Sequence, residues 1–277
     1  MDLVLVIGAT GKTGRAVTRA VTSRHVAVRA AVHSPTHHEA AYAAGAQSIS
    51  VVDLETGTGL DEAVHGVTGV YHLAPNVHPD EVGIAERVVT AAAAAGADRF
   101  VFHSVLQPDD PSMPHHLRKA EAEVVIRAVL PAATVLRPAA YHQNLVDGAR
   151  TGRLDVPYSV DAPFTNVDLD DVAEVAATAL TEPGHAGLSY DLAGAESLTV
   201  RQQAQVAERV LGHPVITTDT GLEAWLAGPG ANLSEQVRDD LAAMFRRYDA
   251  HGLSGDSAPL TRLLGRRPTT WGAVLAR

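Results

Sequence analysis

The first half of the chain alternates between two hydrophobic patterns. Residues 3–8, LVLVIG, form a continuous apolar run closed by glycine, which is typical of a strand buried on both faces of a parallel sheet. Five further runs of this kind follow, at 26–32, 48–53, 69–74, 99–105 and 133–139. Stretches with helical spacing separate them, at 12–23, 38–44, 59–67, 80–95 and 113–129. Strands that alternate with helices predict an α/β fold with a doubly wound parallel sheet.

The rhythm changes after Pro138. A short helix and turn are expected over 141–154, and a polar strand entry followed by a helix over 156–183, where Asp168 or Asp170 can serve as the cap. Strands are expected at 188–194 and 214–220. An amphipathic helix over 198–212 has Thr199 as its cap and Gly212 as its end, and the chain is mostly helical from Leu222. We therefore expect two domains, 1–138 with later segments returning to it, and a smaller mixed α/β lobe over 139–277.

Composition narrows the class of protein. The chain has 277 residues, 46% of them hydrophobic, and a net charge of −10, which argues against general affinity for nucleic acid or anionic membranes. It contains no cysteine, so disulfides, thiolate nucleophiles and cysteine-bound metals are excluded. No leader is apparent and no apolar run approaches the roughly 20 residues of a membrane span. We expect a cytoplasmic protein with a small-molecule partner, and a homodimer is left open.

A glycine pattern follows the first strand and opens the first helix. Gly8, Gly11 and Gly14 form G-x-x-G-x-x-G with Thr10, Lys12 and Thr13 between them. The first glycine permits a tight turn, the second allows close approach of a pyrophosphate, and the third allows the helix to pack on the strand. This context predicts a Rossmann-type dinucleotide site, and the alternative is a tight turn that binds nothing.

The second strand indicates which dinucleotide is preferred. NAD sites place Asp or Glu after this strand, whereas here it continues as HSPTHH without an acid. Arg29 and His33 can carry positive charge and favour a 2′-phosphate, so NADP(H) is expected over NAD(H). His37 and His38 are cationic candidates or a solvated pair, and no metal site is expected because a third ligand is not identifiable.

Other strand ends supply further cofactor candidates. Asp53 could bind the adenine amine or could cap the next helix. Leu73, Ala74 and Pro75 follow the fourth strand, where ligands of such sheets bind.

Together these motifs resemble the NmrA-like branch of atypical short-chain dehydrogenases/reductases. The resemblance rests on GATGKTG, VFHSVLQP, MPHHLRKAEAE, VLRPAAYHQNL and VDLDDVAEVAATAL, with weaker similarity to the end of the chain. It implies a Rossmann domain that binds NADP(H), a C-terminal lobe that binds substrate, and activities that include quinone and ketone reduction as well as cofactor sensing.

Residue by residue, the resemblance assigns the glycine loop to the pyrophosphate and Lys119 to the nicotinamide ribose. Ser104 falls where related reductases keep Ser or Thr, Asn144 falls in the loop over the nicotinamide, and Pro138 ends a strand beside the cofactor. His115 stands where typical members have a catalytic tyrosine, four residues before the lysine. Only two lysines occur, Lys12 and Lys119, and both lie on cofactor motifs.

Carbonyl reduction needs a proton for the developing alkoxide. Imidazole can donate it near neutral pH, so His115 is the candidate acid, with Lys119 lending positive charge and Ser104 hydrogen-bonding the substrate oxygen. The alternative is that His115 and His116 only satisfy backbone groups at a helix start, with Ser112 as cap. His116, Tyr141, His142, Asn144 and Phe164 are candidates for the substrate pocket, and aromatic residues scattered in a core are the competing explanation.

Three functions therefore stand at this point. The first is an NAD(P)H-dependent reductase of a quinone, ketone or other conjugated carbonyl. The second is an NADP(H)-binding sensor without turnover, and the third is a non-redox enzyme on the same scaffold.

Overall fold

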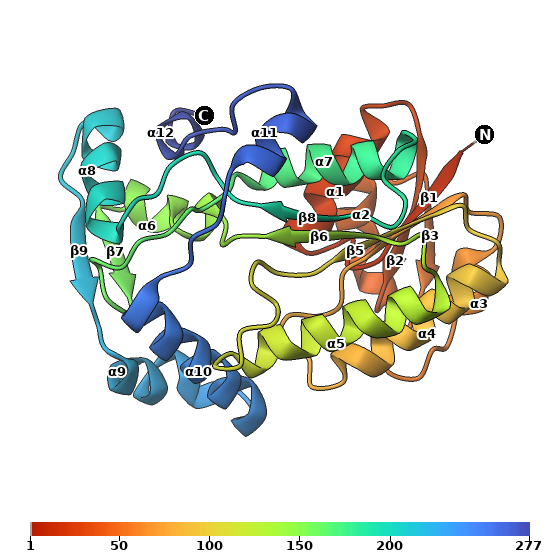
Figure 1. Ribbon diagram of the computed structural model, residues 1–277, viewed down its shortest axis with the longest axis horizontal. Coiled ribbons are helices and arrows are strands. Elements are labelled where there is room, and N and C mark those ends of the chain that lie inside the picture. Colours follow the sequence, from red (N-terminus) through yellow and green to blue (C-terminus); the bar gives the residue numbers. More distant parts are fainter. Residues whose placement is uncertain (1) are drawn as a thin grey trace. The chain divides into compact units, whose positions relative to one another are not determined.

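A seven-stranded sheet forms the centre of the fold in the computed structural model, which describes residues 2–277 (Figure 1). Its order is β3-β2-β1-β4-β5-β6-β8. The strands are β1 (Leu3–Val6), β2 (Ala27–Val32), β3 (Ser48–Val51), β4 (Gly69–His72), β5 (Arg99–His103), β6 (Thr134–Pro138) and β8 (Ser189–Leu192). Pairing is parallel from β3 through to β6, for example Val4 with Val28 and Gly69. The predicted α/β class and doubly wound sheet are confirmed.

Helices cover both faces of this sheet. In Figure 1, α3 (Leu60–Val64), α4 (Glu81–Ala94) and α5 (Pro114–Val129) lie on one face, and α1 (Lys12–Thr22) and α7 (Leu169–Thr181) lie on the other. The segment after β2 forms the short helix η1 (Pro35–His37) and α2 (His38–Ala43). A buried apolar cluster joins α3, α4 and α5 to the sheet through residues such as Ile84, Val88, Phe100 and Ile126. Continuous apolar runs therefore become strands covered on both faces.

Contacts divide the chain into two compact units. The first contains residues 1–108, 118–137 and 172–190, and the second contains 109–117, 138–171 and 191–277. The sequence placed a boundary at 138; the structure gives the short segment 109–117 to the second unit and returns 172–190 to the first.

The second unit combines short strands with helices. Its strands β7 (Arg153–Val156) and β9 (Ile216–Asp219) pair in parallel. Its remaining elements are η2 (His142–Asn144), α6 (Val146–Arg150), α8 (Val200–Leu211), α9 (Leu222–Ala227), η3 (Pro229–Asn232), α10 (Glu235–His251), α11 (Ala258–Leu264) and α12 (Trp271–Leu275). The sequence missed β7, since four residues with an alternating pattern behind a glycine turn resemble the end of a loop.

Several predicted helix ends are confirmed. Thr199 accepts a hydrogen bond from the Gln202 N–H while the Gln202 side chain accepts one from the Thr199 N–H, a complete capping box. Gly212 ends the same helix with φ +75°. Of the two acids proposed to cap α7, Asp168 accepts a hydrogen bond from the N–H of Asp170.

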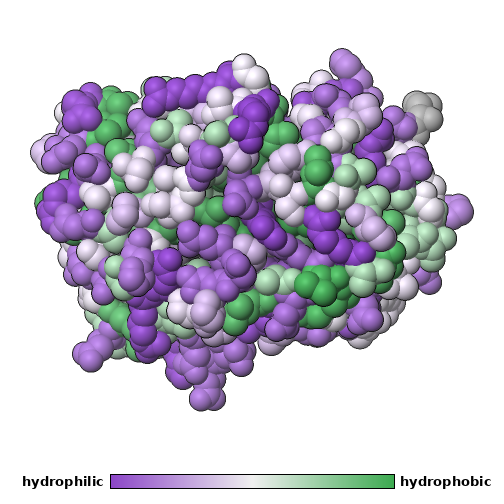
Figure 2. Space-filling view, in the orientation of Figure 1, coloured by the Kyte–Doolittle hydropathy of each residue, from purple (hydrophilic) through white to green (hydrophobic). Residues whose placement is uncertain are grey.

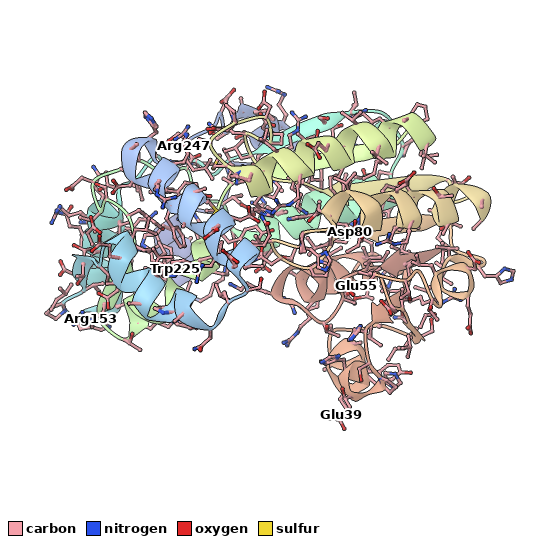
Figure 3. All side chains as sticks on the ribbon, turned by 90° about the horizontal axis from the view of Figure 1, so that it is seen from below. Glu39, Glu55, Asp80, Arg153, Trp225 and Arg247 are labelled. Carbon is pink, nitrogen blue, oxygen red and sulfur yellow. The ribbon has the colours of Figure 1, made fainter. Side chains whose placement is uncertain are left out.

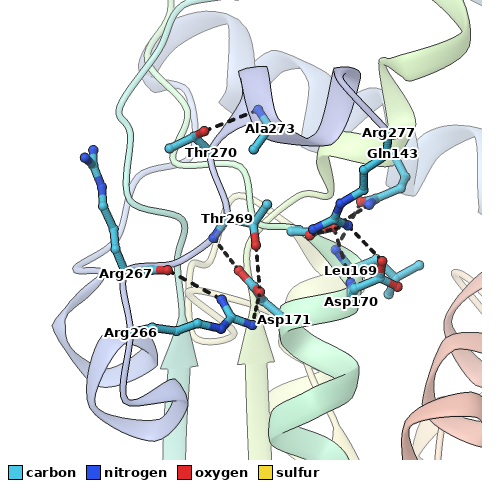
Figure 4. Close-up of polar contacts among 11 residues, drawn as sticks. Gln143, Leu169, Asp170, Asp171, Arg266, Arg267, Thr269, Thr270, Ala273 and Arg277 are labelled. Atoms are coloured by element: carbon cyan, nitrogen blue, oxygen red, sulfur yellow. Dashed lines mark hydrogen bonds and ion pairs between the residues drawn. The ribbon is translucent and has the colours of Figure 1, made fainter.

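A polar network fixes residues 266–277 to the start of α7 (Figure 4). The buried carboxylate of Asp171 accepts hydrogen bonds from Arg266 Nη2 and from both the N–H and the hydroxyl of Thr269. Arg277 forms ion pairs with Asp168 and Asp170. Two buried acids of the second unit thus receive their partners from a segment about a hundred residues further along the chain.

The face shown in Figure 2 is mostly hydrophilic, with apolar residues at the surface in smaller patches, one of them over α5. Val124 and Val129 are exposed on that helix. Among residues 2–277, no helix combines the length and the apolar character that crossing a bilayer requires.

Candidate functional site

The glycine loop between β1 and α1 has the conformation its spacing predicts. Gly8 has φ +76°, a region that L-residues rarely adopt, and the Gly11 N–H donates to the Gly8 carbonyl at 3.1 Å. A Cβ at Gly14 would lie 2.1 Å from the Gly8 carbonyl oxygen and 2.7 Å from the Ala9 Cα. The first and third glycines are therefore required by the fold itself, one for the turn and one for the packing of α1 on β1.

Gly11 is different, because nothing in the protein requires a glycine there. It precedes α1 with φ −73° and ψ 167°, which any residue can adopt, and a Cβ would meet only the Gly8 carbonyl oxygen at 3.5 Å. Gly11 and Lys12 are exposed, and no acidic residue occupies the first turn of α1. A bare backbone at a helix N-terminus fits a pyrophosphate, which needs close approach to N–H groups and the positive end of the helix dipole.

The loop after β4 lies against the glycine loop. A Cβ on Gly8 would come within 3.0 Å of the Leu73 carbonyl oxygen. The sheet order reverses between β1 and β4, which is the switch point where doubly wound sheets bind ligands. The structure therefore brings Leu73, and with it Ala74 and Pro75, to the edge that carries Gly8. Pro138 lies at the end of β6 and is buried.

The loops after β3 and β4 also meet, near Glu55 and Asp80 in Figure 3. His78 Nε2 lies 3.3 Å from Glu55 Oε1, and the Asp80 N–H donates to His78 Nδ1. Asp53 Oδ1 accepts hydrogen bonds from the N–H groups of Glu55 and Thr56. The side-chain hydrogen bond from Thr56, followed by these two backbone bonds, lowers the pKa of Asp53. Asp53 therefore caps its own turn and does not cap α3, which begins after Gly59.

His33 and Arg29, the two candidates for a 2′-phosphate, have separate places. His33 is exposed directly after β2 and is close enough to Asp53 for its charge to contribute to the lowered pKa of that carboxyl. Arg29 is the third residue of β2, and its Nη1 donates to the carbonyl oxygens of Glu62, Ala63 and His65 at the end of α3. The guanidinium of Arg29 thus satisfies a helix C-terminus, and its expected contact with a phosphate stays a prediction.

Lys119 lies inside the first unit, at the end of β5. Its Nζ is 2.7 Å from Glu81 Oε1 and donates to the carbonyl oxygen of His103 at 3.2 Å. The ammonium also lies 5.2 Å from the centre of the Phe102 ring. The carboxyl ends of β4 and β5 thus carry a buried positive charge.

Ser104 follows β5 and bonds to a buried acid. Its hydroxyl donates to Glu123 Oε1 at 2.5 Å, and only 1% of the residue is exposed. Glu123 is also paired with Arg137 on β6. The hydroxyl that was expected to contact a substrate oxygen donates to a carboxylate inside the protein, and its catalytic role stays a prediction.

His115 and His116 are both buried at the start of α5. Their rings are 5.7 Å apart in an edge-to-face arrangement. Ser112 was the expected cap of this helix, but its N–H and hydroxyl both bond Asp110 Oδ1, and α5 begins at Pro114. The ring positions therefore leave the proton-donor hypothesis for His115 standing as a prediction.

Two of the predicted substrate residues belong to the core of the second unit. The buried His142 ring stacks on Trp271 at 5.5 Å, and burial lowers its pKa to about 4 against the opposing charges of Asp168 and Asp171. Phe164 is buried among aromatic rings, including Tyr158 and Tyr248. Close packing accounts for the positions of both residues, and their assignment to a pocket wall stays a prediction.

Two further predicted pocket residues are more accessible than these. Tyr141 is half-buried and bridges to Val167, and Asn144 is exposed at the end of η2. They remain predictions.

Sequence reasoning singled out neither Glu81 nor His72 as a site residue. Glu81 stands at the start of an alanine-rich helix, where an acid is ordinarily explained by the helix dipole. His72 ends β4, fully buried, and its ring stacks on Phe102 at 5.6 Å. The available signal was the position of both residues beside the end of β4, the strand next to the glycine loop.

The fold and the glycine loop define a dinucleotide-binding α/β protein of the Rossmann class. Comparison with protein families shows that the chain belongs to the NmrA-like family, whose model matches residues 1–270. The predicted family is thus confirmed.

Individual relatives agree with this assignment. A (4-alkanoyl-5-oxo-2,5-dihydrofuran-3-yl)methyl phosphate reductase of Streptomyces griseus is 33% identical over 230 residues, 80% of this chain and 78% of the relative. An NAD(P)H azoreductase of Xenophilus azovorans is 27% identical over 277 residues, 97% and 95% of the two chains. An NADPH-dependent quinone oxidoreductase of Escherichia coli, solved with NADPH, superimposes with a TM-score of 0.82 at 23% identity over 99% of this chain and 98% of that one.

Proposed function

We propose that this protein is an NAD(P)H-dependent reductase of a quinone, ketone or other conjugated carbonyl compound. The observation that carries the proposal is Gly11, which the fold does not need and which leaves the N-terminus of α1 open at the switch point of the sheet. The relatives support the reaction class, since their names describe reductases of a dihydrofuranone phosphate, an azo compound and a quinone.

The residues that would hold the cofactor belong to the glycine loop, lie at or after the carboxyl ends of strands, or, in the case of Lys119, reach such an end from α5: Gly8, Thr10, Gly11, Lys12, Thr13, Gly14, His33, Asp53, Leu73, Ala74, Pro75, Lys119 and Pro138. When bound, NAD(P)H supplies the hydride. Lys119 provides a positive charge for ribose hydroxyls, and His115 holds the proton that the substrate oxygen needs. His116, Tyr141 and Asn144 are the remaining candidates for contact with the substrate.

A preference for NADPH over NADH is part of the proposal. The stretch 33–38 after β2 contains no acid to bind a ribose 2′-hydroxyl, and His33 is exposed at the end of the strand. Because Arg29 is bound to the end of α3, His33 is the residue to test. His33→Ala should raise the KM for NADPH more than that for NADH, and equal effects would contradict a role at the 2′-phosphate.

The decisive experiment measures NADPH oxidation at 340 nm against three substrate groups: quinones, azo dyes and butenolides with a conjugated carbonyl. Turnover of one group supports the reductase. The alternative is a sensor that binds cofactor without turnover, which is favoured by one observation, the histidine at position 115 where reductases of the superfamily have tyrosine. Tight NADPH binding with no turnover of any group would support the sensor and contradict the reductase.

The role of the glycine loop has a matched control. Gly11→Ala and Gly272→Ala both add a Cβ that meets no atom closer than 3.4 Å, and neither position has a positive φ. Both variants should melt like the wild type, but only Gly11→Ala should weaken NADPH binding, by about tenfold or more because the added carbon lies where a phosphate must approach. Equal affinities of the two variants would place the cofactor elsewhere.

We also propose a cytoplasmic location, and a homodimer remains an expectation for light scattering to test.

A further inference from the structure

Glu81 and Lys119 form a buried ion pair between α4 and α5. The Nζ to Oε1 distance is 2.7 Å, Glu81 is 0% exposed and Lys119 is 4% exposed. The two residues are 38 positions apart, so the pair exists only in the folded first unit. Neither helix needs the pair for its own formation.

The lysine is held on three sides. Besides Glu81, it donates to the carbonyl oxygen of His103, the last residue of β5, and it lies over the face of the Phe102 ring. Two of its three N–H donors are thus used by the protein. The ammonium lies at the carboxyl end of β5. This strand is the neighbour of β4, whose following loop lies against the glycine loop.

Stability does not explain this arrangement. Among residues 2–277, the second oxygen of Glu81 and both ring nitrogens of the buried His72 have no hydrogen-bond partner. Burial and the nearby charge of Lys119 lower the pKa of His72 to about 3, so its ring is neutral. Burying two charges is costly, and well-packed apolar residues of the same size often stabilise a protein as well or better. Buried polar groups without partners call for an explanation other than stability.

We propose that Glu81 is a positioning residue, which holds the charged Lys119 ammonium at the end of β5 for the ribose hydroxyls of the nicotinamide cofactor. This inference rests on the proposed function, because the role of Lys119 does. Glu81 itself touches neither cofactor nor substrate and acts through the lysine alone.

The first test is Glu81→Gln, which keeps the shape of the side chain and removes its charge. We expect the Kd for NADPH, measured by fluorescence titration, and the KM for NADPH to rise about tenfold or more, since displaced binding groups have effects of this size. The KM for the second substrate should change less. Glu86→Gln is the matched control, because Glu86 is exposed on the same helix, and it should bind NADPH like the wild type.

A second variant separates positioning from folding. The double change Glu81→Leu with Lys119→Met removes both charges and leaves an apolar pair, so its melting temperature should equal or exceed that of the wild type. Its NADPH affinity should nevertheless be as weak as that of Glu81→Gln. Glu81→Asp, which restores a carboxylate, should recover part of the affinity.

The outcomes are distinct for the two proposals. If the wild type neither binds nor oxidises NADPH, the proposed function fails. If the wild type binds NADPH and the Glu81→Gln variant binds it equally well, the pair has a structural role only and this inference is overturned.

Discussion

The hydroxyl of Ser104 donates a hydrogen bond to the carboxylate of Glu123 across a distance of 2.5 Å. The same carboxylate receives Arg137 from β6, so one buried acid joins the end of β5 to the neighbouring strand. A serine at the end of a strand near the expected cofactor site suggests a catalytic role. In this structure, however, the Ser104 hydroxyl donates its hydrogen bond to Glu123.

Ser104→Ala therefore tests a structural role. The variant should lose about 1–2 kcal/mol of unfolding free energy, the usual cost of removing a buried hydrogen bond to a charged group, while kcat stays within about threefold of the wild type. Urea unfolding and steady-state kinetics measure the two quantities. A loss of kcat of about a hundredfold with unchanged stability would return Ser104 to the catalytic machinery.

Gly14→Ala should damage the fold itself. The new Cβ would lie 2.1 Å from the Gly8 carbonyl oxygen, a distance that forces α1 away from β1. We expect Gly14→Ala to lose about 3 kcal/mol or more of unfolding free energy, or to be insoluble. Gly11→Ala, in contrast, should melt at the same temperature as the wild type. Normal stability of Gly14→Ala would mean that the loop relaxes freely, contrary to its observed packing.

Arg29→Ala should lower stability without changing cofactor selectivity. Its guanidinium donates to three carbonyl oxygens at the end of α3, which lose a charged donor in the variant. We expect about 1–2 kcal/mol of destabilisation and an unchanged ratio of NADPH to NADH efficiency. A selective rise in the KM for NADPH would show instead that Arg29 reaches a 2′-phosphate.

His142 makes the stability of the second unit depend on pH. Burial lowers its pKa to about 4 from an ordinary value of 6.5, so between these values the unfolded chain binds a proton that the folded chain does not. Above pH 6.5 His142 is neutral in both states and does not affect stability. As the pH drops from 6.5 towards 4, this residue lowers the free energy of unfolding by about 1.4 kcal/mol per pH unit.

His142→Phe keeps a ring on Trp271 and removes the titrating group. Urea unfolding at pH 7, 6 and 5 should show a shallower pH dependence for the variant than for the wild type. His251→Gln, a change at an exposed position, is the control and should keep the wild-type slope. Parallel curves for all three proteins would mean that the pKa of His142 is the same in the folded and the unfolded chain.

Asp171 and Asp170 offer a matched pair of acids on one helix. Asp171 is buried and accepts three hydrogen bonds from Arg266 and Thr269, whereas Asp170 is exposed and pairs with Arg277. Asp171→Asn should cost about 2–3 kcal/mol and Asp170→Asn less than about 1 kcal/mol. Tryptophan fluorescence reports the change, because both tryptophans, Trp225 and Trp271, lie in the second unit. Equal effects would show that burial does not distinguish the two acids.

Much of the first unit could be predicted from the sequence, because most of its strands are continuous apolar runs. The order of its elements and the glycine loop depend on neighbours in sequence, which a pattern displays directly, as do the caps at Thr199 and Gly212 in the second unit. The second unit was less accessible, since β7 is short and pairs with a strand about sixty residues away.

Side-chain partners were the part that patterns could not supply. Arg29 has the positive charge and the position in β2 that a 2′-phosphate would favour. The direction of its side chain, however, is set by the carbonyl oxygens at the end of α3, which accept its hydrogen bonds. His142 and Phe164 have the chemistry of pocket residues, and only the packing around Trp271 and Tyr248 places them in a core. Glu81 was overlooked because an acid in the first turn of a helix already has an explanation.

The return of residues 172–190 to the first unit has a consequence for synthesis on the ribosome. β8 borders β6, and the Val135 N–H donates to the carbonyl oxygen of Leu188, so the sheet is completed only by residues that emerge more than fifty positions after β6. Until then a nascent chain exposes β6 as an unpaired edge, the kind of surface that promotes aggregation. Slow release of the second half should therefore reduce the yield of folded protein, even though every residue of the glycine loop has long since been made.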